Sequence, residues 1–258
     1  MNNTFNLKRF GLLFKKHTVE HAKTTLLSIG VLIGLLFMVL GFCAYSNNGV
    51  LVPIMQLLTF SWFLLFGGSI YTSLTFIDLS DKKKVIPALT LPASHFEKFL
   101  VAWIYSFIFF QAVLLGAFYL VDNIIVGLGP RPVGDMGKVI NVFTIQQRPV
   151  SVFVIFVFFH ALSLWGALFF EKLHFIKTAL CLFIALIAFI FFNNQFLKLL
   201  VKDSIGGAPF NDLGININER FFRIEVAPNI ATYGWWVLAL TILLIWVSAF
   251  LRLKEKEA

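Results

Sequence analysis

The sequence predicts an all-α membrane protein, with six transmembrane helices preceded by an interfacial amphipathic helix. Of its 258 residues, 59% are hydrophobic and only 13% are charged, whereas about 25% are charged in a typical soluble domain. A helix needs about 20 apolar residues to cross the hydrocarbon core of a bilayer, and six apolar runs approach or exceed that length. These two observations make lipid the expected solvent of the chain.

The six predicted spans are residues 25–45, 50–76, 99–121, 149–170, 176–192 and 231–251. The fifth run is short and leads into Asn193, Asn194 and Gln195, so the position of its outer end is left open. No internal repeat, low-complexity linker or soluble domain interrupts the series. We therefore expect residues 1–258 to form a single transmembrane domain.

Residues 5–23, before the first span, have the pattern of an amphipathic helix. At 100° per residue one side is largely apolar and the other is basic. The first side carries Leu7, Phe10, Leu13, Phe14, His17 and His21, and the second carries Lys8, Arg9, Lys15, Lys16 and Lys23. We expect this helix to lie at the membrane surface, with its cations toward anionic lipid headgroups.

The distribution of positive charge predicts the orientation. If both termini are cytoplasmic, 14 of the 21 Lys and Arg residues fall on the cytoplasmic side, as the positive-inside rule requires. Residues 77–98 then form a cytoplasmic loop and residues 193–230 an outer loop. The acids of the third connection, Asp122 and Asp135, are expected outside. The outer loop carries Gly and Pro breaks around a short amphipathic piece, so a small structured cap is expected there.

The net charge of +8 does not indicate a nucleic-acid partner, because the basic residues mainly flank apolar runs. Cys43 and Cys181 lie in apolar runs near opposite faces of the membrane, too far apart for a disulfide. The N-terminal apolar run is too long for a cleaved signal core, so we expect the N-terminus to be retained.

Two motifs resemble known chemical sites. The stretch HTVEH, His17 to His21, matches a zinc-protease pattern, but it lies on the predicted interfacial helix and lacks the third ligand that such sites need. The stretch GPRPVGDMGK, residues 129–138, has its lysine misplaced for a phosphate-binding loop. We interpret both as structural and predict no metal site.

Polar residues inside the spans are candidates for a translocation path. Gln56, Thr59 and Phe63 fall on one face of the second span, and His160 is the only histidine deep in a span. Each of the polar residues could equally join neighbouring helices, and Ser163 and Gly166 near His160 favour close packing. Gly30 and Gly34 form a GxxxG pair, which suits helix packing or dimerisation.

We predict that the chain is not an enzyme. No Ser/His/Asp set, pair of carboxylates or Cys/His cluster converges in the membrane, so no catalytic residue is assigned. A membrane enzyme acting on lipid is therefore disfavoured. A proton-driven carrier would usually show an acid in the middle of a span, and none is found there.

The stretch LTLPASHFEKFLVAWIYS, which enters the third span, resembles the "LP-small-S/T-x-x-E/K" phrase of permease subunits of type-two ATP-binding-cassette exporters. The layout of the chain is similar to theirs over its whole length. Pro92 biases Leu91 to an extended shape, and Ser94 with Glu97 forms an S-x-x-E capping box. The resemblance implies a loop that docks on a separate ATPase and transmits its closure to the spans.

The predicted ATPase-docking residues combine charge with apolar contact. They are Asp81, Lys82, Lys83, Lys84, Leu91, Pro92, Ser94, His95, Phe96 and Glu97. The resemblance further implies a cytoplasmic ATPase partner that carries ATP and Mg²⁺, and a second permease chain that is identical or related. This chain itself is expected to hold no cofactor. The expected location is the cytoplasmic (inner) membrane of a bacterium.

Two functions therefore remain open. The first is the transmembrane subunit of an ATP-driven exporter with an unidentified substrate. The alternative is a non-transporting scaffold or accessory subunit of an envelope complex, which would use the outer loop as its interface.

Overall fold

The computed structural model is dominated by long helices, as the composition predicts. It describes residues 5–75, 93–130, 138–143, 149–170, 173–201, 204–206, 213–217, 220–225 and 228–257. Within these ranges six helices are long and apolar enough to cross a membrane. The prediction of a multi-pass helical membrane protein is thus confirmed.

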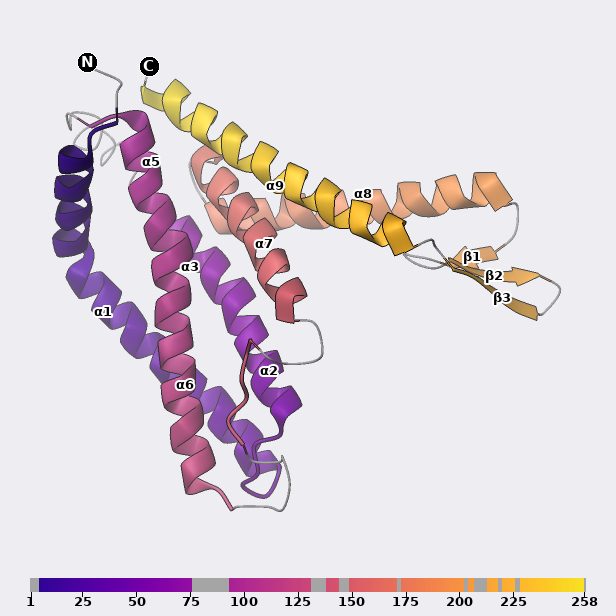
Figure 1. Ribbon diagram of the computed structural model, residues 1–258, viewed down its shortest axis with the longest axis horizontal. Helices are drawn as coiled ribbons and strands as arrows, with labels where there is room; N and C mark the ends of the chain where they lie inside the picture. The colour runs from indigo at the N-terminus through magenta and orange to yellow at the C-terminus, as the bar shows by residue number, and fades with distance from the viewer. Residues whose placement is uncertain are drawn as a thin grey trace.

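The predicted interfacial helix and the first span form one continuous helix, α1 (Leu7–Ser46). Asn6 caps it, because its side-chain oxygen accepts hydrogen bonds from the backbone N–H groups of Lys8 and Arg9. Figure 1 shows that α1 changes direction after its first turns. The placement of residues 5–23 at a membrane surface stays a prediction.

The second and third spans each contain a π-helical turn. The second consists of α2 (Pro53–Trp62), the π-helix η1 (Phe63–Gly67) and α3 (Gly68–Thr75). The third consists of α5 (His95–Trp103), the π-helix η3 (Ile104–Phe109) and α6 (Phe110–Leu128). The third helix thus extends beyond the predicted span of 99–121 at both ends.

The last three spans are α7 (Pro149–Phe169), α8 (His174–Val201) and α9 (Pro228–Glu257). Helix α8 continues well past residue 192, where the predicted fifth span ends. Asn193, Asn194 and Gln195 are therefore helical, because polar side chains are compatible with a helix whose backbone bonds are internal.

The predicted outer loop, residues 193–230, contains a small sheet that the helical fold class does not anticipate. Strands β1 (Ser204–Gly206), β2 (Leu213–Ile217) and β3 (Arg220–Ile224) pair antiparallel in the order β1-β2-β3. Ile205 pairs with Ile215, which in turn pairs with Phe222. The predicted structured cap is therefore a three-stranded sheet.

The starts of α1 and α5 and the end of α9 lie at one end of the molecule, and the α1–α2 turn and the end of α6 lie at the other (Figure 1). We name these the predicted cytoplasmic end and the predicted outer end. The larger core cluster joins α1, α2, η1, α6 and α7, and a smaller one joins α5, α7 and α9. At the outer turn, Gly49 has a φ of +84° and packs against Pro130, so a side chain there would be strained.

Candidate functional site

The start of α5 is a closed capping box. The Ser94 Oγ atom accepts a hydrogen bond from the Glu97 backbone N–H at 3.2 Å, and Glu97 Oε2 accepts one from the Ser94 backbone N–H at 3.0 Å. Each residue thus satisfies a donor that the helix start would leave unpaired. The capping box predicted from the S-x-x-E spacing is confirmed.

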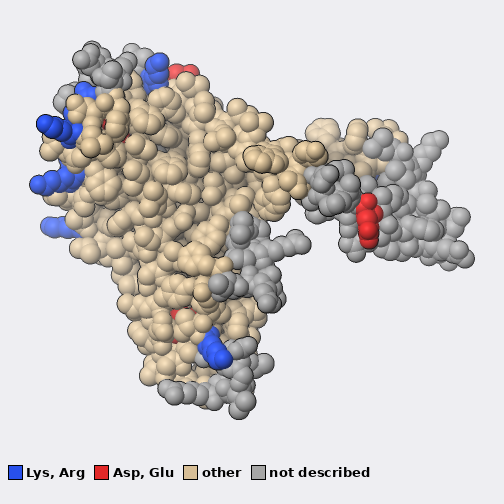
Figure 2. Space-filling model, in the orientation of Figure 1, with Lys and Arg blue, Asp and Glu red and all other residues tan. Residues whose placement is uncertain are grey.

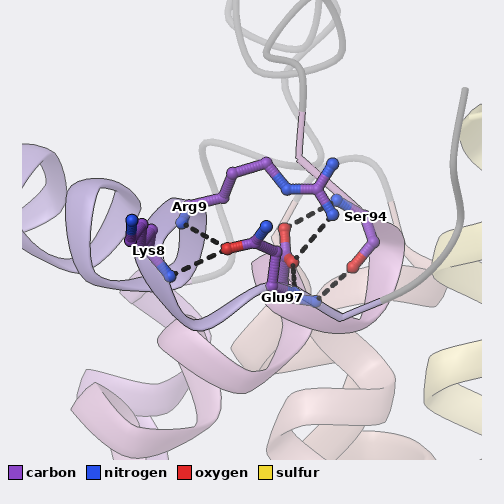
Figure 3. Close-up of polar contacts among 5 residues, drawn as sticks. Lys8, Arg9, Ser94 and Glu97 are labelled. Atoms are coloured by element: carbon purple, nitrogen blue, oxygen red, sulfur yellow. Dashed lines mark hydrogen bonds and ion pairs between the residues drawn. The ribbon is translucent and has the colours of Figure 1, made fainter.

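Glu97 also joins α5 to α1. Its Oε1 atom accepts a hydrogen bond from the Asn6 backbone N–H at 2.7 Å and lies 3.2 Å from Arg9 Nη2 (Figure 3). Asn6 is itself the cap of α1, so one carboxylate supports the first residues of two helices. The Glu97 side chain is fully buried, and three groups hold its carboxylate: the backbone N–H groups of Asn6 and Ser94 and the guanidinium of Arg9.

The surroundings of Glu97 favour its ionised form. Burial by itself would raise the pKa of Glu97. The hydrogen bonds from Asn6 and Ser94 and the charge of Arg9 lower this pKa by more than burial raises it. The net effect is a pKa below the usual glutamate value. The ion pair with Arg9 is therefore present at neutral pH.

Aromatic rings extend this joint to α9. Phe250 of α9 packs edge-on against Phe96 and Phe99 of α5, with ring centroids 6.2 and 5.6 Å apart. On the other side of Phe96, the ring of Phe5 lies 6.1 Å away. Edge-to-face ring pairs of this kind are stabilising. We call this meeting point of α1, α5 and α9 the α5 corner, defined by Asn6, Arg9, Ser94, Phe96, Glu97, Phe99 and Phe250.

The predicted docking residues divide into two groups at the α5 corner. Ser94 and Glu97 are buried and point into the joint, whereas Phe96 is 49% exposed and His95 is partly exposed. The inward pair gives the helix start its rigidity, and only the second group is available to a partner. The other predicted docking residues lie outside the described residues: Asp81, Lys82, Lys83, Lys84, Leu91 and Pro92.

Part of the predicted apolar face of residues 5–23 packs on the third span. Phe14 and His17 lie against Tyr105, with ring centroids 5.0 and 4.3 Å apart, and Thr18 forms a hydrogen bond with the Tyr105 hydroxyl. Exposed lysines remain on the other side: Lys8, Lys15, Lys16 and Lys23. Figure 2 shows Lys and Arg gathered along this edge of the molecule.

The rings of His17 and His21 in the HTVEH motif pack against each other in a tilted arrangement, with centroids 4.5 Å apart. Within the described ranges, no group of three or more His, Cys, Asp or Glu is arranged to hold a metal ion. Of the two rings, His17 contacts η3, through Tyr105.

Gln56, a predicted path residue, fastens an extended segment to α2. Its Nε2 donates to the carbonyls of Leu51 and Lys138, at 3.2 and 2.9 Å, and its Oε1 accepts from the Ile140 backbone N–H at 3.0 Å. The side chain is fully buried, as is almost all of Thr59 on the same face, and Phe63 opens η1. The structure thus gives Gln56 a joining role.

His160, the other predicted path residue, lies in an aromatic cluster between three spans. Its Nε2 is 2.9 Å from Ser106 Oγ in η3. Four rings surround the imidazole at centroid distances of 5.0–6.4 Å: Trp103, Phe107, Phe156 and Trp246. Its Nδ1 has no hydrogen-bond partner in the part of the chain that the structure describes. His160 and Gln56 contact different elements, so no shared polar path joins them through these contacts.

Asp122 is a buried acid that the sequence interpretation placed outside the membrane, in the connection that follows the third span. Helix α6 continues to Leu128, and Asp122 falls on its buried face, with no exposed surface. The spacing contains a signal for this, because residues 114, 118, 121 and 125 already form a buried stripe beside position 122. The predicted third span ended at residue 121, directly before Asp122, and therefore did not include the rest of α6.

No protein-family model matches the chain, and no curated protein or solved structure matches it either. Its function is therefore inferred from the geometry of the α5 corner.

Proposed function

We propose that the chain is the transmembrane subunit of an ATP-driven transporter, similar to the permeases of type-two ATP-binding-cassette exporters. The observation that carries the proposal is that the Glu97 carboxylate accepts the backbone N–H groups of both cap residues, Asn6 and Ser94, and so joins the start of α5 to the start of α1. The predicted docking loop, residues 77–98, ends in this joint. A partner that binds the loop would therefore move the first and third spans together.

The α5 corner is suited to transmitting force. The capping box holds the first turn of α5 in one conformation, the ion pair with Arg9 couples it to α1, and the ring of Phe250 couples it to α9. A packed joint of this kind moves as a unit, because close-packed interiors do not deform continuously. Movement of a docked ATPase would thus reach three spans at one point.

The π-helical turns are suited to bending below this joint. In the third span, η3 begins directly after α5, and the second span carries η1. A π-turn interrupts the regular i→i−4 bonding of a helix, and such turns are frequent at functional sites and kinks. In the proposed mechanism the α5 corner moves as a body and the spans bend at η3 and η1.

The proposed assembly needs further components. A cytoplasmic ATPase would supply ATP and Mg²⁺ chemistry, and a second permease chain would complete the path across the cytoplasmic membrane of a bacterium. Helix α8 exposes large apolar side chains along most of its length, including Phe183, Ile187 and Phe191. In this assembly they would face lipid or the second chain.

The test is co-purification of ATP hydrolysis with the intact chain. Residues 82–92 are replaced by a neutral Gly/Ser linker, which leaves Ser94 and Glu97 in place. We expect the associated ATPase to be lost from this variant. It should be retained when residues 131–137 of the outer connection are replaced in the same way. Undiminished ATPase association in the 82–92 variant would contradict the proposed docking.

The three-stranded sheet between α8 and α9 favours a second candidate, an accessory subunit of an envelope complex. Short antiparallel sheets can add a strand from another protein at their edges, and β1 and β3 are the edge strands here. Replacing residues 207–212 between β1 and β2 would then release the partner, while the 82–92 variant would retain it. The opposite pattern supports the transporter.

A further inference from the structure

Asp122 is an acidic residue that is buried in the core of the molecule. It lies among apolar side chains of the larger core cluster on α6, between Phe118, Val121 and Ile125. None of its surface is exposed, and neither carboxylate oxygen has a hydrogen-bond partner among the residues that the structure describes. The transport proposal makes no use of this group.

A segment outside the helices and strands packs against the same core cluster. We call residues 138–143 the cover. Its backbone is tied down at residues 138 and 140 by Gln56, and at Val142, whose N–H donates to the Tyr119 hydroxyl at 3.0 Å. Ile140 and Val142 are buried. The Ile140 N–H donates to Gln56 and lies beside the Asp122 carboxyl without completing a hydrogen bond to it.

An ionised carboxylate in this position would lack stabilising partners. Removing a carboxylate from water without hydrogen bonds or a counter-charge costs several kcal/mol. Two ligands could remove that cost, a proton or a metal cation. A metal cation needs about six oxygen ligands, and the neighbours on α6 are apolar. A proton needs only the carboxyl itself, so the surroundings favour the proton.

We propose that the Asp122 carboxyl is a proton-binding site, and that release of its proton to the outer solution opens the cover. In the protonated form the carboxyl is neutral and the cover closes over it. In the ionised form the carboxylate needs water, and water reaches it only when Ile140 and Val142 leave their buried positions. The cover is thus closed when Asp122 is protonated and open when Asp122 is ionised.

Among the residues that the structure describes, few other titratable groups surround this site. At this end of α6 the packed elements carry Cys43 and Tyr45 on α1, Tyr119 on α6 and Lys138 in the cover, and α2 carries none. Tyr45 and Lys138 are exposed, and the Tyr119 hydroxyl accepts the Val142 N–H. A response assigned to Asp122 must therefore disappear when that residue alone is made neutral.

The experiment measures exposure of the cover as a function of pH, in the full chain reconstituted in lipid nanodiscs. A single cysteine replaces Ile140 in a background with Cys43→Ala and Cys181→Ser, and a water-soluble maleimide is the probe. Asn141→Cys in the same background is the matched control, because Asn141 is already exposed. The ratio of the two labelling rates removes the intrinsic pH dependence of thiol reactivity.

We expect the ratio to rise by up to about tenfold per pH unit while Asp122 begins to ionise, because the ionised fraction grows in that proportion. With Asp122→Asn the ratio should be independent of pH. A ratio that is flat in the native background overturns the proposal, as does one that still rises with Asp122→Asn. A ratio that follows Na⁺ concentration at fixed pH also overturns it, and assigns the site to a metal cation.

Infrared spectroscopy of the unsubstituted chain tests the same group without a cysteine. A protonated buried carboxyl gives a carbonyl band distinct from that of a carboxylate. We expect such a band until the pH at which the labelling ratio levels off, and its loss in Asp122→Asn. A carboxylate signal from Asp122 at every pH would overturn the proposal.

Discussion

Arg9 and Glu97 are 88 positions apart in the sequence, yet Arg9 Nη2 lies 3.2 Å from Glu97 Oε1. The contact joins the first turn of the first helix to the first turn of the third span. Arg9 remains about one third exposed, while Glu97 is fully buried. The hydrogen bonds that Glu97 accepts from Asn6 and Ser94 therefore contribute more to stability than its ion pair with the partly exposed Arg9.

Replacing Glu97 with Ala should lower the free energy of unfolding by about 1–3 kcal/mol, because the backbone N–H groups of Asn6 and Ser94 lose their acceptor and Arg9 loses its partner. Denaturant unfolding in detergent micelles measures the change. The matched control is Glu255→Ala, which breaks the exposed pair with Arg252 and should cost less than about 1 kcal/mol. Equal effects of the two substitutions would contradict the joining role of Glu97.

The contribution of Glu97 should also depend on pH. Its pKa is lower in the folded protein than the ordinary value of 4.5. A depressed folded pKa adds stability above the unfolded value, and this is lost as the pH falls through the folded value. The difference in unfolding free energy between the native chain and Glu97→Gln should thus be constant near neutral pH and shrink below about pH 4.5. A difference that grows toward acid pH would show the opposite shift.

The capping box was predictable from the sequence, but the joint to α1 was not. Ser94 and Glu97 are three residues apart, and that spacing fixes a local geometry. Asn6 and Arg9 reach Glu97 only because α1 and α5 pack together, and a single sequence contains no signal for which of several cations meets a buried acid. The prediction therefore identified the helix start at Ser94 but not that the Glu97 side chain points inward, and the docking role of this segment stays a prediction.

Gly166 permits the contact between α7 and α8. A Cβ atom at position 166 would overlap the side chain of Thr178. Gly166→Ala should therefore destabilise the protein by about 1–3 kcal/mol, since the helices must separate. Thr178→Ala should recover part of the loss in the double variant, because it removes two of the three overlapping atoms. Unfolding of the four variants in micelles gives the coupling.

Gly30→Ala and Gly34→Ala are the controls for Gly166, because nothing lies within 4 Å of an added Cβ at either position. Neither substitution should lower the stability of the single chain, since Ala is the better helix former. A loss in either variant would indicate that the GxxxG face is occupied, as the predicted dimerisation requires. Cross-linking of the native chain in membranes would then identify a second copy.

The hydrogen bond between Ser106 and His160 should contribute more to stability than the hydrogen bond of Ser61 within its own helix. Ser106→Ala leaves His160 Nε2 buried without its partner and should cost about 1–3 kcal/mol. Ser61→Ala removes only a bond to the carbonyl of Leu57 in its own helix, and should cost less. If Ser106→Ala is no worse than Ser61→Ala, His160 is satisfied by a group outside this contact.

The positions of the spans were largely predictable, because hydropathy and the length of a helix across a bilayer are local properties. The ends of the helices were not. Asp122 stopped the predicted third span, although a buried charged group can lie within a helix when the chain covers it. The sheet was missed because its strands are only three to five residues long, and pairing partners are not marked by local composition.

The shared cap at Glu97 also sets an order of events during biosynthesis. Asn6 and Arg9 are made first, but the carboxylate that they bind is added only after two further spans have been started. Until then the N-terminal residues lack this acceptor, and membrane insertion proceeds with the joint open. The contact can therefore form only after the start of the third span has been made and has packed against α1. A chain truncated before residue 97 would lack this contact.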